Sequence, residues 1–92
     1  MSTVDSKAEW SVYIVRCADD SLYTGIAKDV AARLAKHNAG KGAAYTRARR
    51  PVKLLYSENA LTRSKALSRE AGIKSLPRPQ KQLLIASARK RR

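Results

Sequence analysis

Side chains that could do chemistry are few in this 92-residue chain, which has one histidine (His37), one cysteine (Cys17) and seven carboxylates. One histidine and one cysteine leave little room for a zinc cluster, and neither a P-loop nor a Rossmann glycine pattern occurs. A two-metal nuclease usually needs several converging carboxylates, whereas residues 33–92 contain only Glu58 and Glu70. A site with one metal ion, or with none, is what the composition leaves open.

Tyr13 and Tyr23 lie ten residues apart in two segments rich in β-branched and aromatic residues. We expect these segments to form an antiparallel hairpin. If Cys17 pairs with Ser21, Tyr13 lies opposite Gly25, which leaves room for a substrate, and both phenols project from one face. A register shifted by one residue would separate the phenols. Without other information, two tyrosines on one face are more typical of a core than of a site.

Arg33 and His37 are four residues apart and therefore share one helical face. Glu70 falls within a second helical segment, four residues before Lys74. Both pairs have a plain structural interpretation, a solvated face for Arg33 and His37 and an i,i+4 ion pair for Glu70.

The charge is unevenly distributed. Twenty basic and seven acidic residues give a net charge of +13, yet residues 1–32 hold three bases and five acids. Almost all of the positive charge therefore lies in residues 33–92, which favours a polyanionic partner such as nucleic acid. The Gly- and Arg-rich segment 40–51, with Tyr45 inside it, is either a phosphate-binding loop or a solvated basic loop.

The elements that would position these residues follow from periodicity and capping. We expect strands over 10–17, 22–27 and 52–57, and helices over 30–38, 63–76 and 80–88. Asp29 and Thr62 are suitable N-caps, and Pro77 and Pro79 separate the last two helices. The order ββαβαα predicts an α+β fold, a three-stranded antiparallel sheet flanked by helices.

One domain over residues 10–88 is expected, with a flexible lead-in at 1–9 and a basic disordered tail at 89–92. No run approaches the roughly 18–20 apolar residues of a membrane span, and no signal sequence is evident. We therefore expect no membrane association and a cytoplasmic location. Cys17 is expected to be a small buried hydrophobe.

The ordered set of two tyrosines, arginine, histidine and glutamate resembles the GIY-YIG nuclease family over residues 10–80. The two name motifs read Ser11-Val12-Tyr13 and Tyr23-Thr24-Gly25. The small stand-alone bacterial branch is similar in the run Arg33-x-x-x-His37-Asn38-Ala39-Gly40 followed by Tyr45-Thr46-Arg47 and Arg49-Arg50-Pro51. Structure-specific endonucleases that cut branched DNA are similar as well. Ser11 and Thr24 depart from the name motifs, and the late asparagine of many members is missing after Glu70.

The resemblance implies hydrolysis of DNA phosphodiesters with one divalent ion, Mg²⁺ or alternatively Mn²⁺, bound by Glu70. Arg33 would stabilise charge on the phosphoryl oxygens. Tyr13, supported by Tyr23, would deprotonate or orient the attacking water, which requires nearby cations to lower a phenol pKa of about 10. His37 would relay the proton or hold the tyrosine.

The implied partner is single-stranded, branched or damaged DNA. Substrate contacts are expected at Gly25, Lys41, Tyr45, Thr46, Arg47, Arg49 and Arg50. Lys53 is a further candidate for a phosphate contact, and Trp10 and Tyr45 are candidates for stacking on unpaired bases. The alternative is a non-catalytic nucleic-acid-binding module on the same scaffold.

Overall fold

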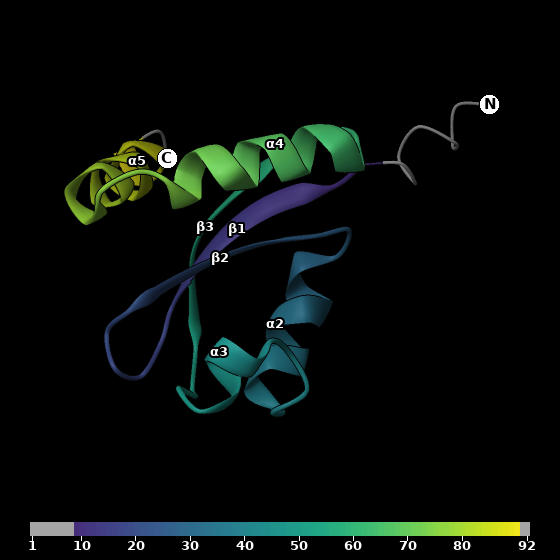
Figure 1. Ribbon diagram of the computed structural model, residues 1–92, viewed down its shortest axis with the longest axis vertical. Helices are drawn as coiled ribbons and strands as arrows, with labels where there is room; N and C mark the ends of the chain where they lie inside the picture. Colours follow the sequence, from purple (N-terminus) through teal and green to yellow (C-terminus); the bar gives the residue numbers. More distant parts are fainter. Residues whose placement is uncertain (1–8, 91–92) are drawn as a thin grey trace.

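The computed structural model describes residues 9–90, in which three strands and four helices form an α+β fold (Figure 1). The elements, in chain order, are β1 (Ser11–Arg16), β2 (Leu22–Ala27), α2 (Val30–Asn38), α3 (Ala44–Arg47), β3 (Lys53–Asn59), α4 (Arg63–Lys74) and α5 (Arg78–Lys90). The predicted fold class and the order of the major elements are confirmed. Residues 1–8 of the predicted lead-in lie outside the described residues. No helix within residues 9–90 is both long and apolar enough to cross a membrane.

The sheet is antiparallel with the order β2-β1-β3, so β1 is central and β2 is an edge strand. Tyr13 pairs with Gly25, and the Cys17 N–H donates to the Ser21 carbonyl at 2.8 Å. This is the predicted hairpin register. Because side chains alternate along a strand, it places the Tyr13 and Tyr23 side chains on the same face of the sheet.

Both faces of the sheet are covered, which gives three layers (Figure 1). Val12 and Ile14 of β1 point to the face covered by α4 and α5, where they pack with Ala66, Ile73 and Ile85. Residues 13, 15 and 17 point to the opposite face and join a second cluster completed by α2. Cys17 is buried there, as expected. The continuous apolar run of β1 thus reflects a strand buried on both sides.

Several boundaries differ from the prediction. Strand β1 covers 11–16 rather than 10–17, and α4 ends at Lys74 rather than at residue 76. The segment 40–51 contains the short helix α3, whose four residues are too few to show a helical period. Helix α5 begins at Arg78, because Pro79 is tolerated in the first turn, where its missing N–H would have no partner. The same helix continues to Lys90, so the predicted disordered tail is helical at 89–90, and 91–92 lie outside the described residues.

Strand β3 lies over 53–59 rather than 52–57, and a bulge interrupts its pairing with β1. Ile14 pairs with Tyr56 and Val15 with Leu54, which leaves Leu55 as the extra residue. Leu55 and Tyr56 both pack on the α4 and α5 side, while Leu54 is 37% exposed. The simple alternation expected for this strand is therefore broken at Leu55.

Asn38, expected only as part of a helix stop, fastens the end of α2 to the segment before β3. Its Nδ2 donates to the Val52 carbonyl at 3.1 Å, and its Oδ1 accepts from the Val52 N–H at 2.7 Å. Val52 is buried, so both backbone groups would lose their partners without this amide.

Replacing Asn38 with alanine should lower the free energy of unfolding by about 1–3 kcal/mol, because two buried backbone groups lose their hydrogen bonds. Urea unfolding followed by circular dichroism measures the effect. Asn38→Asp, which keeps the acceptor and loses the donor, should fall between the two. Equal stability of Asn38→Ala and wild type would show that water replaces the amide at no cost.

Candidate functional site

A pocket of about 380 Å³ lies at the β2 edge of the sheet, and all five predicted catalytic residues line it. The sheet contributes Tyr13, Tyr23 and Gly25, helix α2 contributes Arg33 and His37, and α4 contributes Glu70. The pocket therefore extends around the edge strand from the α2 side to the α4 side. Its lining is completed by Ile26, Lys41, Gly42, Ala43, Arg63 and Leu67.

Gly25 allows Tyr13 to reach this pocket from the central strand. A Cβ atom on Gly25 would lie 2.6 Å from the Tyr13 hydroxyl oxygen and 2.8 Å from Cζ, which is too close for any side chain. The phenol of Tyr13 thus lies across the edge strand directly over the Gly25 backbone. The predicted space at Gly25 is real, but Tyr13 fills it.

A buried chain of hydrogen bonds starts at the Tyr13 hydroxyl. That hydroxyl lies 2.8 Å from His37 Nε2, and His37 Nδ1 lies 2.7 Å from Thr46 Oγ1. Thr46 donates its single hydroxyl hydrogen to the Ala43 carbonyl at 3.0 Å, so its oxygen accepts from His37 Nδ1–H. The Nε2 atom of neutral His37 is then an acceptor, and Tyr13 donates to it. The lone pairs of the Tyr13 oxygen are left to accept a hydrogen bond from the pocket.

Burial sets the protonation states of this chain. The pKa of Tyr13 is raised to about 12, mainly by burial and further by Tyr23 and Glu70, while the charge of Arg33 opposes the rise. Arg33 thus lowers the Tyr13 pKa as expected, but desolvation outweighs it and the pKa lies above its usual value. Burial, followed by the charge of Arg33, lowers the pKa of His37 below its usual value of 6.5. Both groups are neutral near pH 7.

Tyr23 anchors an aromatic stack beside this chain. Its ring centroid lies 5.5 Å from that of His37 and 5.9 Å from that of Tyr45, onto which it stacks at 20°. The Arg49 guanidinium lies over Tyr45 at 3.9 Å and binds Asp19 at 2.9 Å. Helix α3 is thereby held between the site and the tip of the hairpin.

The predicted substrate-binding residues lie in different surroundings. Gly25 and Lys41 line the pocket, and the side chains of Tyr45, Arg47 and Arg50 are exposed. Thr46 is fully buried behind His37, so the prediction that it contacts substrate is corrected to a role in holding the histidine. Arg49 is occupied by Asp19 and Tyr45.

Sequence reasoning missed three contributors to the site, Arg63, Leu67 and Gly42. Arg63 and Leu67 reach the pocket because they lie seven and three residues before Glu70, on the same face of α4. Gly42 packs directly against the His37 imidazole, where a Cβ would collide with Nδ1. The helical spacing around Glu70 was a usable signal for Arg63 and Leu67, whereas nothing local to Gly42 indicated its contact.

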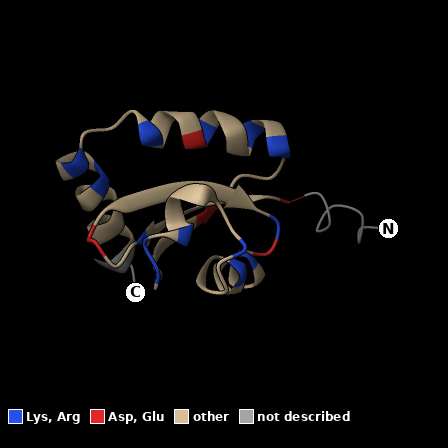
Figure 2. Cartoon of the chain, turned by 60° about the horizontal axis from the view of Figure 1, so that its bottom comes forward, with Lys and Arg blue, Asp and Glu red and all other residues tan. Residues whose placement is uncertain are grey.

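Glu70 is the one acidic residue of α4, and basic residues flank it on both sides (Figure 2). Its side chain is 18% exposed, and Lys74 Nζ lies 3.4 Å from Oε2, which confirms the expected i,i+4 pair. Within residues 9–90 no group of three metal-ligating side chains occurs. A single, partly exposed carboxylate fits Mg²⁺, which keeps several waters and takes other ligands from phosphate, but does not fit an all-protein metal cage.

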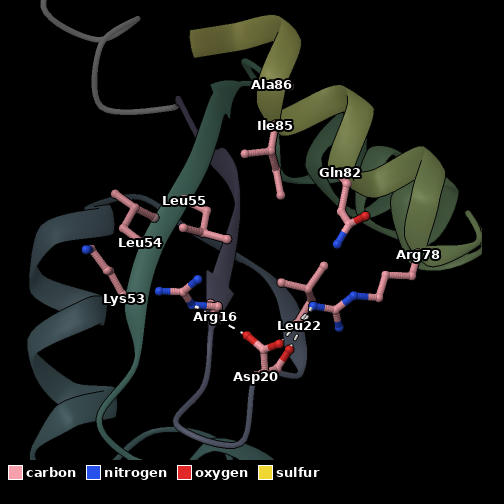
Figure 3. A pocket seen from close by; sticks show the side chains of 10 residues that line it. All are labelled: Arg16, Asp20, Leu22, Lys53, Leu54, Leu55, Arg78, Gln82, Ile85 and Ala86. Atoms are coloured by element: carbon pink, nitrogen blue, oxygen red, sulfur yellow. Dashed lines mark hydrogen bonds and ion pairs between the residues drawn. The ribbon is translucent and has the colours of Figure 1, made fainter.

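A larger cavity of about 520 Å³ lies elsewhere, between the start of β3 and helix α5 (Figure 3). Arg16, Lys53 and Arg78 line it, and Asp20 lies 3.9 Å from both arginines. None of the five predicted catalytic residues borders it. Lys53, a candidate phosphate contact, is therefore separated from the pocket that holds Glu70.

Comparison with known proteins identifies the family. Residues 9–83 match the GIY-YIG catalytic domain. The chain belongs to the GIY-YIG family. Membership implies nuclease activity and DNA binding. The five residues that the sequence resemblance predicts to be catalytic all line the pocket at the β2 edge.

Relatives of similar size support this membership. A UPF0213 protein of Staphylococcus epidermidis is 61% identical over 74 residues, which cover 80% of this chain and 90% of the relative. The solution structure of a UPF0213 protein from Bacillus halodurans is 40% identical with a TM-score of 0.55, covering 85% of this chain and 83% of that one. A solution structure from E. faecalis is 36% identical with a TM-score of 0.60, covering 88% and 86%. This GIY-YIG chain is thus similar to bacterial proteins over most of their length as well as its own.

Gly25 and Gly72 should respond in opposite directions to alanine substitution. Gly25→Ala should lower the free energy of unfolding by about 1–3 kcal/mol, because the new methyl displaces the Tyr13 phenol. Gly72→Ala should raise it by about 0.5–1 kcal/mol, because a Cβ there meets nothing within 4 Å inside α4. Urea unfolding measures both. A neutral Gly25→Ala would mean that Tyr13 leaves the edge strand at no cost.

Proposed function

We propose that this protein is a Mg²⁺-dependent endonuclease that hydrolyses phosphodiester bonds in single-stranded, branched or damaged DNA. The observation that supports it best is the hydrogen-bonded chain Tyr13–His37–Thr46, which ends in a pocket shared with Arg33 and Glu70. A buried polar chain that leads into a pocket lined by basic side chains and one carboxylate is suited to moving a proton beside a phosphate.

Tyr13 and His37 would act together as the base. A water molecule donates one hydrogen to the Tyr13 oxygen as the phenol passes its own proton to His37 Nε2. The water oxygen bonds to phosphorus as the bond between phosphorus and the departing deoxyribose oxygen breaks, and that oxygen leaves as an alkoxide and takes a proton from solvent. Tyr13 is then never a free phenolate, which its pKa of about 12 would disfavour. Thr46 keeps Nε2 unprotonated beforehand by accepting from Nδ1–H. The imidazolium formed for the duration of this step is favoured by the negative charge developing on the phosphate.

Arg33 and Glu70 would manage the phosphate itself. The Arg33 guanidinium is exposed in the pocket and can donate two parallel hydrogen bonds to phosphoryl oxygens. Glu70 would hold the Mg²⁺ ion, which supplies charge neutralisation at the phosphate when bound. Lys41 and Arg63 line the same pocket and add positive charge at its rim.

The position of the pocket supports a flexible substrate. Its walls come from α2 on one side of the edge strand and α4 on the other, so the scissile phosphate must enter between two helices. Duplex DNA is stiff over about 150 base pairs and would have to bend sharply to do so, whereas a single strand or a branch point bends freely. We assign such activity to DNA repair, recombination or uptake in the cytoplasm.

Glu70→Gln should abolish cleavage of labelled single-stranded or branched oligonucleotides in Mg²⁺, lowering the rate at least a hundredfold, and EDTA should stop the wild-type enzyme. Binding of the oligonucleotide should persist, because one carboxylate is lost from a basic surface. Glu58→Gln is the matched control. It removes the other carboxylate of residues 33–92, which binds Arg69 at 2.7 Å outside the pocket, and should still cut.

The two candidate functions give different results here. A non-catalytic nucleic-acid-binding module would bind oligonucleotides with a steep salt dependence, and neither Mg²⁺ nor Glu70→Gln would change its binding or produce any cleavage. Cleavage by Glu70→Gln at the wild-type rate would remove Glu70 from the mechanism.

Thr46 gives a second test, through the pH profile. The wild-type cleavage rate should fall as the pH decreases through the lowered pKa of His37, which lies below the usual 6.5, because protonated His37 can no longer accept from Tyr13. Thr46→Val leaves Nδ1 without its acceptor and permits the other tautomer, so kcat should fall on the order of tenfold to a hundredfold with little change in KM. Thr46→Ser keeps the hydroxyl and should retain activity and the acid limb. Equal activity of Thr46→Val and Thr46→Ser would contradict the assigned tautomer.

A further inference from the structure

Trp10, just before β1, lies in a shallow groove of about 290 Å³ beside the catalytic pocket. Arg33 lines both the groove and the pocket. Arg63 lines the pocket, and its guanidinium carbon lies 5.7 Å from the centroid of the Trp10 ring. The groove and the pocket therefore share Arg33, and Arg63 lies between the pocket and Trp10.

The cations around this groove are not neutralised by carboxylates. Lys28, Arg33, Lys36 and Arg63 are all exposed, and none takes part in the ion pairs found within residues 9–90. Asp29, the acid that lines the groove, accepts from the Ala32 N–H as the N-cap of α2. By contrast, the arginines of the larger cavity already face Asp20. The groove at Trp10 is the better match for a chain of phosphates.

Trp10 is half-buried, with part of its side chain packed on the core. Of the two aromatic candidates it is nevertheless the one that can receive a base. Tyr45 has Tyr23 stacked on its ring and Arg49 over it at 3.9 Å. The ring of Trp10 borders the open groove, and its neighbours Lys28 and Arg63 are each 5.7 Å from the centroid. Cation–π contacts of exposed side chains at this distance are weak compared with base stacking, so a base can displace one of them.

We propose that Trp10, Lys28, Arg33 and Lys36 form a subsite for the unpaired nucleotide adjacent to the scissile phosphate of single-stranded DNA. The base stacks on the indole, and the flanking phosphates lie against the cations. Arg33 then contacts the strand at the boundary between subsite and pocket. The position of this subsite next to a scissile phosphate rests on the proposed nuclease function, whereas binding of the base does not.

Trp10 is the only tryptophan of the chain, so its fluorescence reports the subsite directly. A short oligothymidylate added to the wild-type protein in EDTA should quench this fluorescence. An abasic phosphodiester backbone of the same length and charge should bind more weakly without comparable quenching. Equal quenching by both, or tight binding without quenching, would overturn the subsite.

Variants separate stacking from charge. Measured by anisotropy of a labelled oligothymidylate, Trp10→Leu should weaken binding roughly 5- to 150-fold, the equivalent of about 1–3 kcal/mol of stacking. Trp10→Phe should retain most of the affinity and shows whether an aromatic ring suffices. Circular dichroism checks that both variants are folded. If Trp10→Leu binds like Trp10→Phe, the indole is not a stacking platform.

A pair of lysine variants tests the location of the strand. Lys36→Ala should lower the salt dependence of binding by about one released counterion, whereas Lys81→Ala, on α5, should not. Equal effects would indicate diffuse binding over the whole surface and would contradict the subsite. Cleavage in Mg²⁺ is scored separately. Quenching of Trp10 fluorescence without cleavage would reject the nuclease function and support the subsite. Cleavage that Trp10→Leu leaves unchanged would support the nuclease function and reject the subsite.

Discussion

The buried hydrogen-bonded chain from Tyr13 through His37 to Thr46 is the interaction on which the rest of the site depends. His37 is 1% exposed, so each of its ring nitrogens needs a partner inside the protein, and β1 and α3 supply one each. A central strand and two helices are thereby fixed relative to one imidazole. Gly25 and Gly42 both touch this chain, and each is a position where a side chain would collide with it.

Desolvation along this chain determines how the site can work. It favours neutral Tyr13 and neutral His37, so the permanent charges of the site are left to the more exposed Arg33 and Glu70. A free phenolate would face a pKa of about 12, and a proton shared with His37 avoids that state. Burial makes Tyr13 a poor base by itself. It also keeps His37 neutral, and neutral His37 is the acceptor with which Tyr13 can act in concert.

The sequence predicted the parts of this arrangement that have a local signature. The hairpin register followed from turn length and strand pattern, and it placed Tyr13 over Gly25. Helix α3 was missed because its four residues carry no period, and Thr46 was assigned to substrate because it lies in a basic segment. Its burial depends on packing against His37, nine residues away in sequence, which no local rule contains. The bulge at Leu55 is likewise a property of strand pairing.

The positions of the carboxylates indicate more about where a polyanion binds than the net charge of +13 does. Within residues 9–90, Asp19 and Asp20 bind arginines around the tip of the hairpin, and Glu58 binds Arg69 from β3. These pairs reduce the positive potential away from the β2 edge. The cations around Trp10, including Arg33, keep their positive potential. Glu70 is the carboxylate that lines the neighbouring pocket. Because field gradients steer polyanions as they approach, this distribution of acids favours approach of a nucleic acid strand to the pocket in which we propose that Glu70 holds a metal ion.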